Sequence, residues 1–402
     1  MAKSRTVLPS ERNTPRYVVW ELTTLCDHAC GHCGSRADRA RPDELDLAEC
    51  LAVADQLAAM KTREVTLIGG EAYLFDGVLD LIRHLTGLGI RVSIQTGGWG
   101  VTPELARDLK AAGLRALGIS VDGTEQTHDH LRSKVGSHAA ALRAIRAGRD
   151  AGLVVASNTQ VNPLTAPILS ETAHLLRDTG VQVWRCQLTV PMGRASNEPD
   201  YILQPWQILE VLDTLGALQI AFAEETVAAG RPITETFNIV AGNNLGFYSP
   251  HEAILRSDPG GTATYWQGCQ AGVFTMSIES DGTIKACPSL PTAPYVGGNV
   301  RDVAVADVWS SHPALNFVQQ RDTSELWGFC GTCEYGELCG AGCSFTAHCT
   351  LGRRGNNPFC YHRAATLRSQ GERERLVHVV GGIGKRYDFG RFDVVREPWP
   401  AS

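Results

Sequence analysis

The 402-residue chain lacks the features that mark membrane and nucleic-acid-binding proteins. Its apolar runs fall far short of the roughly 18 residues needed to span a bilayer. Its start, MAKSRTVLPSERNTPR, contains no apolar segment of the kind that directs secretion. Basic residues number 37 and acidic residues 43, so no basic excess favours nucleic acid or an anionic membrane surface. We therefore expect a cytoplasmic protein that binds neither a membrane nor nucleic acid.

Cysteine is what the chain has in excess. There are thirteen cysteines, an odd number that does not suit a complete disulfide framework, and a reducing cytoplasm leaves thiols available for metals. Eight of them lie between Cys269 and Cys360. Cys50 and Cys186 fall in a predicted helix and a predicted strand, where we expect them to be core residues. With 43% apolar residues, the chain is expected to be globular, with two or three structural units.

The first half of the chain alternates short apolar runs with segments of helical periodicity. We predict strands at 17–22, 64–68, 91–95, 116–120, 154–160 and 181–188, and helices near 46–60, 76–88, 103–112, 137–151, 167–179 and 205–229. This alternation indicates an α/β fold of parallel strands, either an open doubly wound sheet or an incomplete barrel. In both, ligands bind at the carboxyl ends of the strands.

We expect the chain to divide into five parts. An N-terminal extension covers 1–16, the repeating unit 17–235, a connector 236–268, the Cys-rich part 269–375 and a C-terminal tail 376–402. The Cys-rich part has few long periodic elements, and small loop-rich units commonly need metal or disulfide cross-links to fold. Metal clusters are therefore expected there.

Chemistry-bearing residues follow each predicted strand. Directly after the first strand come Cys26, Cys30 and Cys33, which could hold three irons of a 4Fe–4S cluster and leave the fourth open, or a zinc ion completed by His28 or His32. Gly69-Gly70-Glu71 follows the second strand. Polar residues stand at or after the others: Gln95, Ser120, Asp122, Arg132, Asn158, Gln187 and Arg194.

The CxxxCxxC loop, with His32 before its last cysteine, and the GGE sequence after the second strand resemble the radical S-adenosylmethionine (SAM) family. The resemblance implies a partial (β/α)6 TIM-like barrel, chelation of SAM by the open iron and its cleavage to a 5′-deoxyadenosyl radical. It implies that the glycines let backbone approach the ligand, that Glu71 accepts from the SAM ammonium and that Arg132 pairs with its carboxylate. The implied SAM-binding set is His32, Gly69, Gly70, Glu71, Gln95, Ser120, Asp122, Arg132, Asn158 and Gln187.

The later cysteines resemble those of a SPASM domain. Gly282 is separated from Cys269 by twelve residues and from Cys287 by four. The pattern continues with Cys330-x2-Cys333-x5-Cys339-x3-Cys343 and ends at Cys360. This resemblance implies two auxiliary iron–sulfur clusters. The first would use Cys269, Cys287 and Cys343; its fourth iron would be bound by the nearby Cys349, would be open, or would have a ligand other than cysteine. The second would use Cys330, Cys333, Cys339 and Cys360.

The resemblance implies radical modification of a ribosomally made precursor peptide, giving a cross-link or an oxidised residue. A reductant such as flavodoxin or ferredoxin is implied as a partner. Because few residues precede the first strand, we expect any leader peptide to be recognised by a separate protein or by the junction between the barrel and the SPASM domain. Pro288, where sulfatase maturases have Asp, disfavours that activity. An oxidoreductase, dehydrogenase or epimerase acting on a small molecule is an alternative, as is a zinc-binding interaction protein. No general base is identified.

Overall fold

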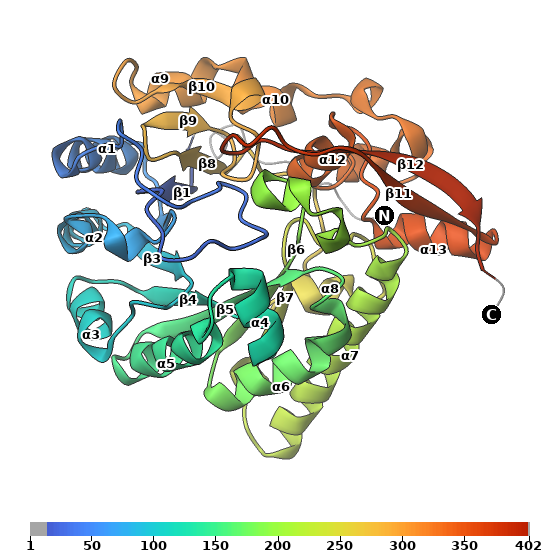
Figure 1. Ribbon diagram of the computed structural model, residues 1–402, viewed down its shortest axis with the longest axis horizontal. Helices are drawn as coiled ribbons and strands as arrows, with labels where there is room; N and C mark the ends of the chain where they lie inside the picture. The colour runs from blue at the N-terminus through green and yellow to red at the C-terminus, as the bar shows by residue number, and fades with distance from the viewer. Residues whose placement is uncertain (1–13, 401–402) are drawn as a thin grey trace.

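A curved ten-stranded sheet forms the centre of the computed structural model, which describes residues 14–400 (Figure 1). Six consecutive strands are parallel: β1 (Tyr17–Glu21), β2 (Glu64–Ile68), β3 (Arg91–Thr96), β4 (Ala116–Ser120), β5 (Val154–Val161) and β6 (Val183–Leu188). This confirms the predicted α/β fold with its partial barrel. The predicted N-terminal extension lies largely outside the described residues.

Helices cover the outer face of the parallel strands (Figure 1). They are α1 (Leu47–Ala59), α2 (Val78–Gly87), α3 (Pro103–Ala111), α5 (Ser137–Asp150), α6 (Leu169–Thr179) and α7 (Gln207–Ala228). The first begins at a capping box, in which Asp46 accepts from the Glu49 backbone N–H and Glu49 accepts from that of Asp46. On the outer face, Trp184 of β6 stacks on Phe237 with ring centroids 6.4 Å apart. The outer side of each strand is therefore closed by core packing.

Three elements before the Cys-rich part were not predicted. Helix α4 (Glu125–Arg132) precedes α5, and the predicted connector 236–268 contains β7 (Asn238–Ala241) and α8 (Glu252–Arg256). Strand β7 pairs in parallel with β6, so the sheet continues one strand beyond the expected six. Its four residues are too few for a recognisable period, and Gly242 follows them at once.

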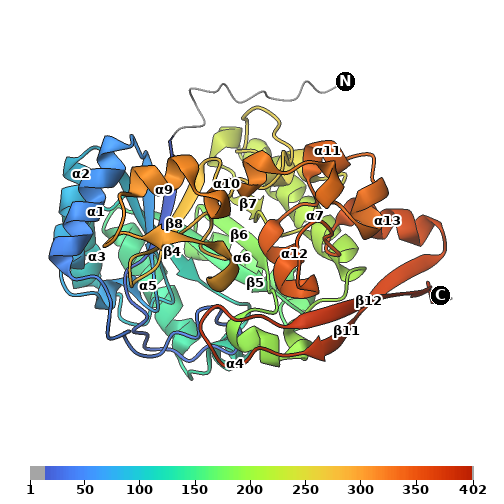
Figure 2. The ribbon, with the colours of Figure 1, turned by 90° about the horizontal axis from the view of Figure 1, so that it is seen from above.

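The Cys-rich part is joined to the barrel through the sheet. Strand β8 (Thr275–Ile278) pairs in parallel with β1, and β9 (Thr283–Lys285) and β10 (Val296–Asn299) continue the sheet antiparallel. The rest is helical: α9 (Val305–Ser311), α10 (Pro313–Gln320), α11 (Gly336–Cys339), α12 (Ser344–Leu351) and α13 (Tyr361–Ser369). Figure 2 shows these helices packed beside the barrel.

The predicted C-terminal tail forms an antiparallel hairpin of β11 (Glu372–Val380) and β12 (Arg391–Pro398). Figure 2 shows it lying along one side of the molecule beside α12. Its connecting segment packs on the loop after β1, where the Tyr387 backbone N–H donates to the Gly34 carbonyl over 3.3 Å. The last strands of the chain therefore help to shape the first loop.

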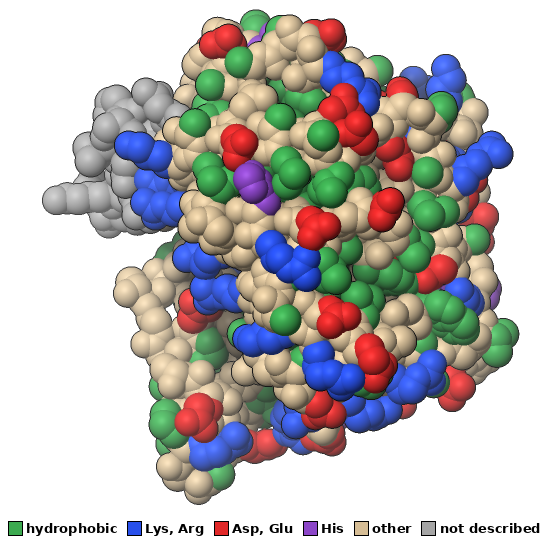
Figure 3. All heavy atoms as spheres, turned by 90° about the vertical axis from the view of Figure 1, so that its left-hand side faces the viewer, with side chains coloured by type: hydrophobic (Ala, Val, Ile, Leu, Met, Phe, Trp, Pro, Cys, Tyr) green, Lys and Arg blue, Asp and Glu red, His purple; other side chains and the backbone are tan. Residues whose placement is uncertain are grey.

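The charges on the surface and the character of the helices match the balanced charge and the short apolar runs of the sequence. Figure 3, which views the side formed by α1, α2 and α3, shows basic and acidic side chains mixed on that face. Among residues 14–400, no helix combines the length and the apolar character needed to cross a bilayer.

Candidate functional site

The loop after β1 surrounds three thiols with hydrogen-bond donors. The backbone N–H of His28 donates to Cys26 Sγ and that of Ala37 to Cys33 Sγ, each over 3.4 Å. Arg132 Nη1 lies 3.9 Å from Cys30 Sγ. Burial raises the pKa of Cys26 to about 12 and that of Cys30 to about 11. These donors suit sulfur carrying negative charge, which a bound cation would stabilise further.

Arg194, in the segment after β6, holds this loop in shape. Its guanidinium donates to the Cys30 carbonyl over 3.1 Å and to the Ala37 carbonyl over 2.7 Å. Its backbone N–H donates to the Cys33 carbonyl over 2.9 Å. The residue expected only as a polar strand end therefore fixes the backbone that carries the thiols.

Gly69 and Gly70 bring the end of β2 against the end of β1. A Cβ at Gly69 would lie 2.4 Å from the Thr23 carbonyl oxygen, and one at Gly70 would lie 2.1 Å from that of Leu25. The sequence argument assigned these glycines to close approach to a ligand. In the structure the close approach is to neighbouring backbone, which places Glu71 beside the cysteine loop.

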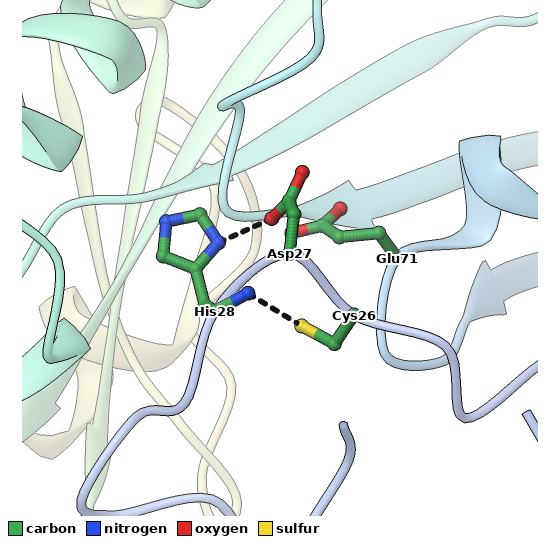
Figure 4. A group of neighbouring side chains, drawn as sticks. All are labelled: Cys26, Asp27, His28 and Glu71. Atoms are coloured by element: carbon green, nitrogen blue, oxygen red, sulfur yellow. Dashed lines mark hydrogen bonds and ion pairs between the residues drawn. The ribbon is translucent and has the colours of Figure 1, made fainter. Parts of the chain in front are cut away.

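Glu71 is held by the end of β3. Its carboxylate accepts from the Thr96 hydroxyl over 2.5 Å and from the Gly97 backbone N–H over 2.7 Å. Burial raises the pKa of Glu71 to about 7 despite these bonds. Figure 4 shows the carboxylate beside Cys26, Asp27 and His28, whose possible ligand atoms all lie within 4.8 Å of one another.

Asp122, Arg132 and His32 form a second polar group beside Cys30. Arg132 Nε donates to Asp122 Oδ2 over 2.8 Å, and its Nη2 lies 2.7 Å from the same oxygen. Burial would raise the pKa of Asp122, but the charge of Arg132 lowers it to about 2. His32 Nε2 lies 3.7 Å from Asp122 Oδ2, and burial lowers the pKa of His32 to about 4. Asp122 thus orients Arg132, whose Nη1 is directed at the thiol.

The remaining predicted contacts lie on the inner face of the barrel. Asn158 Nδ2 donates to Gln95 Oε1, and Gln160 Nε2 donates to Gln187 Oε1 over 3.5 Å. Ser120 pairs in register with Asn158 across β4 and β5. The structure therefore brings Glu71 to Cys26, and Arg132, Asp122 and His32 to Cys30, whereas Gln95 and Asn158 bond to each other.

In the Cys-rich part, Cys269, Cys287, Cys343 and Cys349 form one electrostatic group. Burial is the main cause that raises the pKa of Cys343 to about 12, and the thiols of Cys269 and Cys287 raise it further. Burial also raises the pKa of Cys349, with added effects from Cys343 and Cys287. Cys349, on α12, is therefore close enough to Cys343 and Cys287 to share their electrostatic environment.

The other four cysteines of this part line a single cavity. Its wall contains Cys330, Cys333, Cys339 and Cys360, together with the aromatic residues Phe247, Tyr248, Tyr335 and His362. The Gly342 backbone N–H donates to Cys339 Sγ over 3.2 Å. A hollow walled by four thiols matches the donor set of an iron–sulfur cluster.

Comparison with known families agrees with this division of the chain. Residues 20–173 match the Radical SAM superfamily, and residues 269–334 match SPASM, an iron–sulfur cluster-binding domain. The chain is a radical SAM enzyme with a SPASM domain. The two matched regions correspond to the barrel with its cysteine loop and to the first part of the Cys-rich unit.

Relatives of this radical SAM enzyme carry different names. It is 29% identical to the AdoMet-dependent heme synthase of Methanosarcina barkeri, over 87% of this chain and 97% of the relative. It is 28% identical to the mycofactocin maturase MftC of Mycobacterium ulcerans, over 82% and 83%. The solved structure of Streptococcus suis SuiB bound to S-adenosylmethionine covers 83% of this chain and 74% of its own, with a TM-score of 0.63 and 14% identity. This last likeness shows the fold alone.

The radical SAM and SPASM domains imply a SAM-binding 4Fe–4S cluster and auxiliary iron–sulfur clusters. The residues present fit these groups: three thiols share the loop after β1, and two sets of four share the Cys-rich part. The matches to a radical SAM domain and to an iron–sulfur cluster-binding domain favour iron–sulfur clusters over zinc at these thiols. The zinc-binding alternative is therefore set aside.

Sequence reasoning missed a buried charged network behind the first loop. Glu21, at the end of β1, accepts from the Tyr387 hydroxyl and lies 3.3 Å from Arg41. Lys285 Nζ lies 2.6 Å from Glu279 and 4.1 Å from the centroid of the Tyr387 ring. No sequence signal could reveal it, because Glu21 and Tyr387 are 366 positions apart.

Proposed function

We propose that this radical SAM enzyme abstracts hydrogen from a side chain of a ribosomally made precursor peptide, giving a cross-link or an oxidised residue. The observation that carries the proposal is the pair of four-thiol groups beside the barrel. Two relatives support a peptide substrate: MftC is named a maturase, and SuiB was solved bound to its precursor peptide SuiA.

The residues of the barrel hold and orient SAM in this proposal. When bound, the SAM cluster supplies the electron that cleaves SAM to methionine and a 5′-deoxyadenosyl radical. Glu71 accepts from the SAM ammonium, and Arg132, oriented by Asp122, binds its carboxylate. The reacting carbon must be positioned on the inner face of the barrel, close to the SAM-binding residues.

Electron transfer and partners complete the proposal. Abstraction of hydrogen leaves an unpaired electron on the substrate. The two sets of four cysteines in the Cys-rich part would hold auxiliary clusters, which could accept this electron. A cytoplasmic flavodoxin or ferredoxin would reduce the SAM cluster. A separate protein would present the leader segment of the peptide.

A small-molecule substrate is the second candidate. It is favoured by the Methanosarcina barkeri heme synthase, 97% of whose length this chain covers, compared with 83% for MftC. A tetrapyrrole would use the same SAM-binding residues and the same inner face of the barrel, so only the pocket contacts would differ.

The test is reconstitution under anaerobic conditions. The reduced enzyme, given SAM, should release 5′-deoxyadenosine and methionine, and absence of 5′-deoxyadenosine would reject the radical SAM activity. The enzyme is then co-expressed with short peptides encoded beside its gene, and the peptides are weighed by mass spectrometry. A mass change in a peptide supports the maturase. A modified porphyrin with unmodified peptides would instead support the second candidate.

A further inference from the structure

Arg185 lies in the middle of β6, on the inner face of the barrel. Its neighbours along the strand, Trp184 and Cys186, are fully buried on the outer face against the helices. Side chains alternate along a strand, so Arg185 points to the opposite side. It is exposed although its strand has paired neighbours on both sides, Asn158 of β5 and Val240 of β7. The barrel interior is therefore open at this position.

The surroundings of Arg185 connect it to both ends of the site. Its strand neighbour Asn158 bonds to Gln95, which belongs to the predicted SAM contacts. Across the barrel stands Tyr17 of β1, whose hydroxyl donates to Thr66 over 2.9 Å. Burial raises the pKa of Tyr17, Arg185 lowers it and Cys287 raises it. Arg185 therefore lies beside a strand that carries a predicted SAM contact, and it shares with Cys287 an electrostatic effect on Tyr17 of β1.

Arg185 has no partner for its charge. Within residues 14–400 it makes no hydrogen bond and no ion pair, whereas Arg132 is paired with Asp122 and Arg194 with backbone carbonyls. A guanidinium presents a planar fork of donors that matches a carboxylate with two parallel hydrogen bonds. The nearby amide side chains of Asn158, Gln160 and Gln187 add further N–H donors. An anion entering the barrel would meet donors from two strands.

We propose that Arg185 binds a carboxylate of the substrate inside the barrel, with the amides of β5 and β6 as secondary donors. The inference rests on the proposed function, because the carboxylate belongs to the molecule that the radical attacks. The same chemistry could come from a peptide carboxylate or from an acidic porphyrin side chain. In both cases the contact anchors the substrate between the SAM-binding residues and the first auxiliary thiol group.

The test uses the anaerobic holoenzyme with SAM and the arginine reagent phenylglyoxal. Modification of Arg185 is followed by mass spectrometry of its proteolytic fragment, and that of Arg146, which is exposed on α5, serves as the internal control. One arm adds N-acetylalanine or its neutral N-methylamide. The other adds protoporphyrin IX or its dimethyl ester. At concentrations above its dissociation constant, an acid that binds should slow modification of Arg185 by about threefold or more and leave Arg146 unchanged.

Protection by an acid but not by its neutral partner supports the proposal, and the protecting pair identifies the source of the carboxylate. Equal protection by the neutral compounds, protection by neither acid, or an Arg185 that resists the reagent in the free holoenzyme would each overturn it. Release of 5′-deoxyadenosine is measured on the same preparation. Release without protection contradicts only the carboxylate site, and protection without release contradicts the proposed radical chemistry.

Discussion

Glu71, which follows β2, is held in position for ligand binding by residues at the ends of the neighbouring strands. Its backbone N–H donates to Leu25 in the cysteine loop, and its carboxylate accepts from Thr96 and Gly97 at the end of β3. Three strands therefore fix one buried carboxylate, which is 2% exposed. A group fixed before the ligand arrives loses little freedom on binding, which favours tight recognition of a cation.

We predict that Glu71→Gln weakens SAM binding while the SAM cluster is retained. A hydrogen bond to a charged group contributes about 1.5–3 kcal/mol, so the dissociation constant for SAM should rise roughly 10- to 150-fold. Equilibrium binding to the reconstituted enzyme measures the change. The matched control is Glu64→Gln, because Glu64 is 37% exposed and pairs with Arg91 at the opposite end of β2. Unchanged SAM affinity in Glu71→Gln would remove Glu71 from the SAM site.

Sequence predicts residues of this site when their role depends on spacing along the chain. The three cysteines after β1 are of this kind, since a loop of eight residues holds them together in any fold. The roles of Gly69 and Gly70 depend instead on the backbone of Thr23 and Leu25, which only the paired strands reveal. Arg185 carries no sequence signal beyond being a charge within a strand, because its unpaired state depends on every neighbouring element.

At the scale of elements, the C-terminal hairpin braces the cysteine loop. Arg36 Nε lies 2.9 Å from Asp388 in the segment between β11 and β12, and Tyr387 reaches Glu21 at the end of β1. Tyr387 and Glu21 are both buried. Since a buried carboxylate without donors is costly, this contact should stabilise the arrangement of the first loop.

We expect Tyr387→Phe to destabilise the enzyme by about 1–3 kcal/mol, because it leaves Glu21 with one hydrogen-bond donor fewer. The aromatic ring that faces Lys285 is retained, so the change in stability reports the contribution of the hydroxyl group alone. The midpoint of thermal unfolding of the holoenzyme should fall by several degrees, and iron content reports whether the loop still holds its cluster. The control is Tyr265→Phe, since Tyr265 is 53% exposed. Equal midpoints for the two variants would show that the hairpin contact is dispensable.

The elements that sequence predicted correctly are the ones with a strong local period. β1 to β6 are apolar and rich in β-branched residues, and their helices have clear apolar faces. Helix α4, with sequence EQTHDHLR, has a single aliphatic residue and so no periodic signal. Strands β7 and β8 to β10 have three or four residues each, and their pairing joins segments far apart in the chain. Such short strands form because they pair with the edge of an existing sheet, and a local sequence pattern cannot predict this pairing.

At the scale of the whole molecule, one sheet joins the two iron–sulfur units. Because β8 pairs with β1, the strand that leads into the cysteine loop lies directly beside the strand that follows Cys269. A rigid sheet between them fixes the separation between the first thiol group and the SAM loop. A fixed separation suits electron transfer between the two.

The iron content of two cysteine variants decides the role of Cys349. The wild-type enzyme should hold on the order of twelve irons if each of the three thiol groups binds a 4Fe–4S cluster. Cys349 is fully buried, and the Cys343 and Cys287 thiols raise its pKa, so we expect Cys349→Ala to lose the first auxiliary cluster and retain about eight irons. Cys186→Ala is the matched control, because burial alone raises the pKa of Cys186, and it should keep the full iron content. If Cys349→Ala instead keeps the wild-type iron content and electron paramagnetic resonance spectrum, Cys349 is not a ligand, and the fourth iron of the first auxiliary cluster is open or has a ligand other than cysteine.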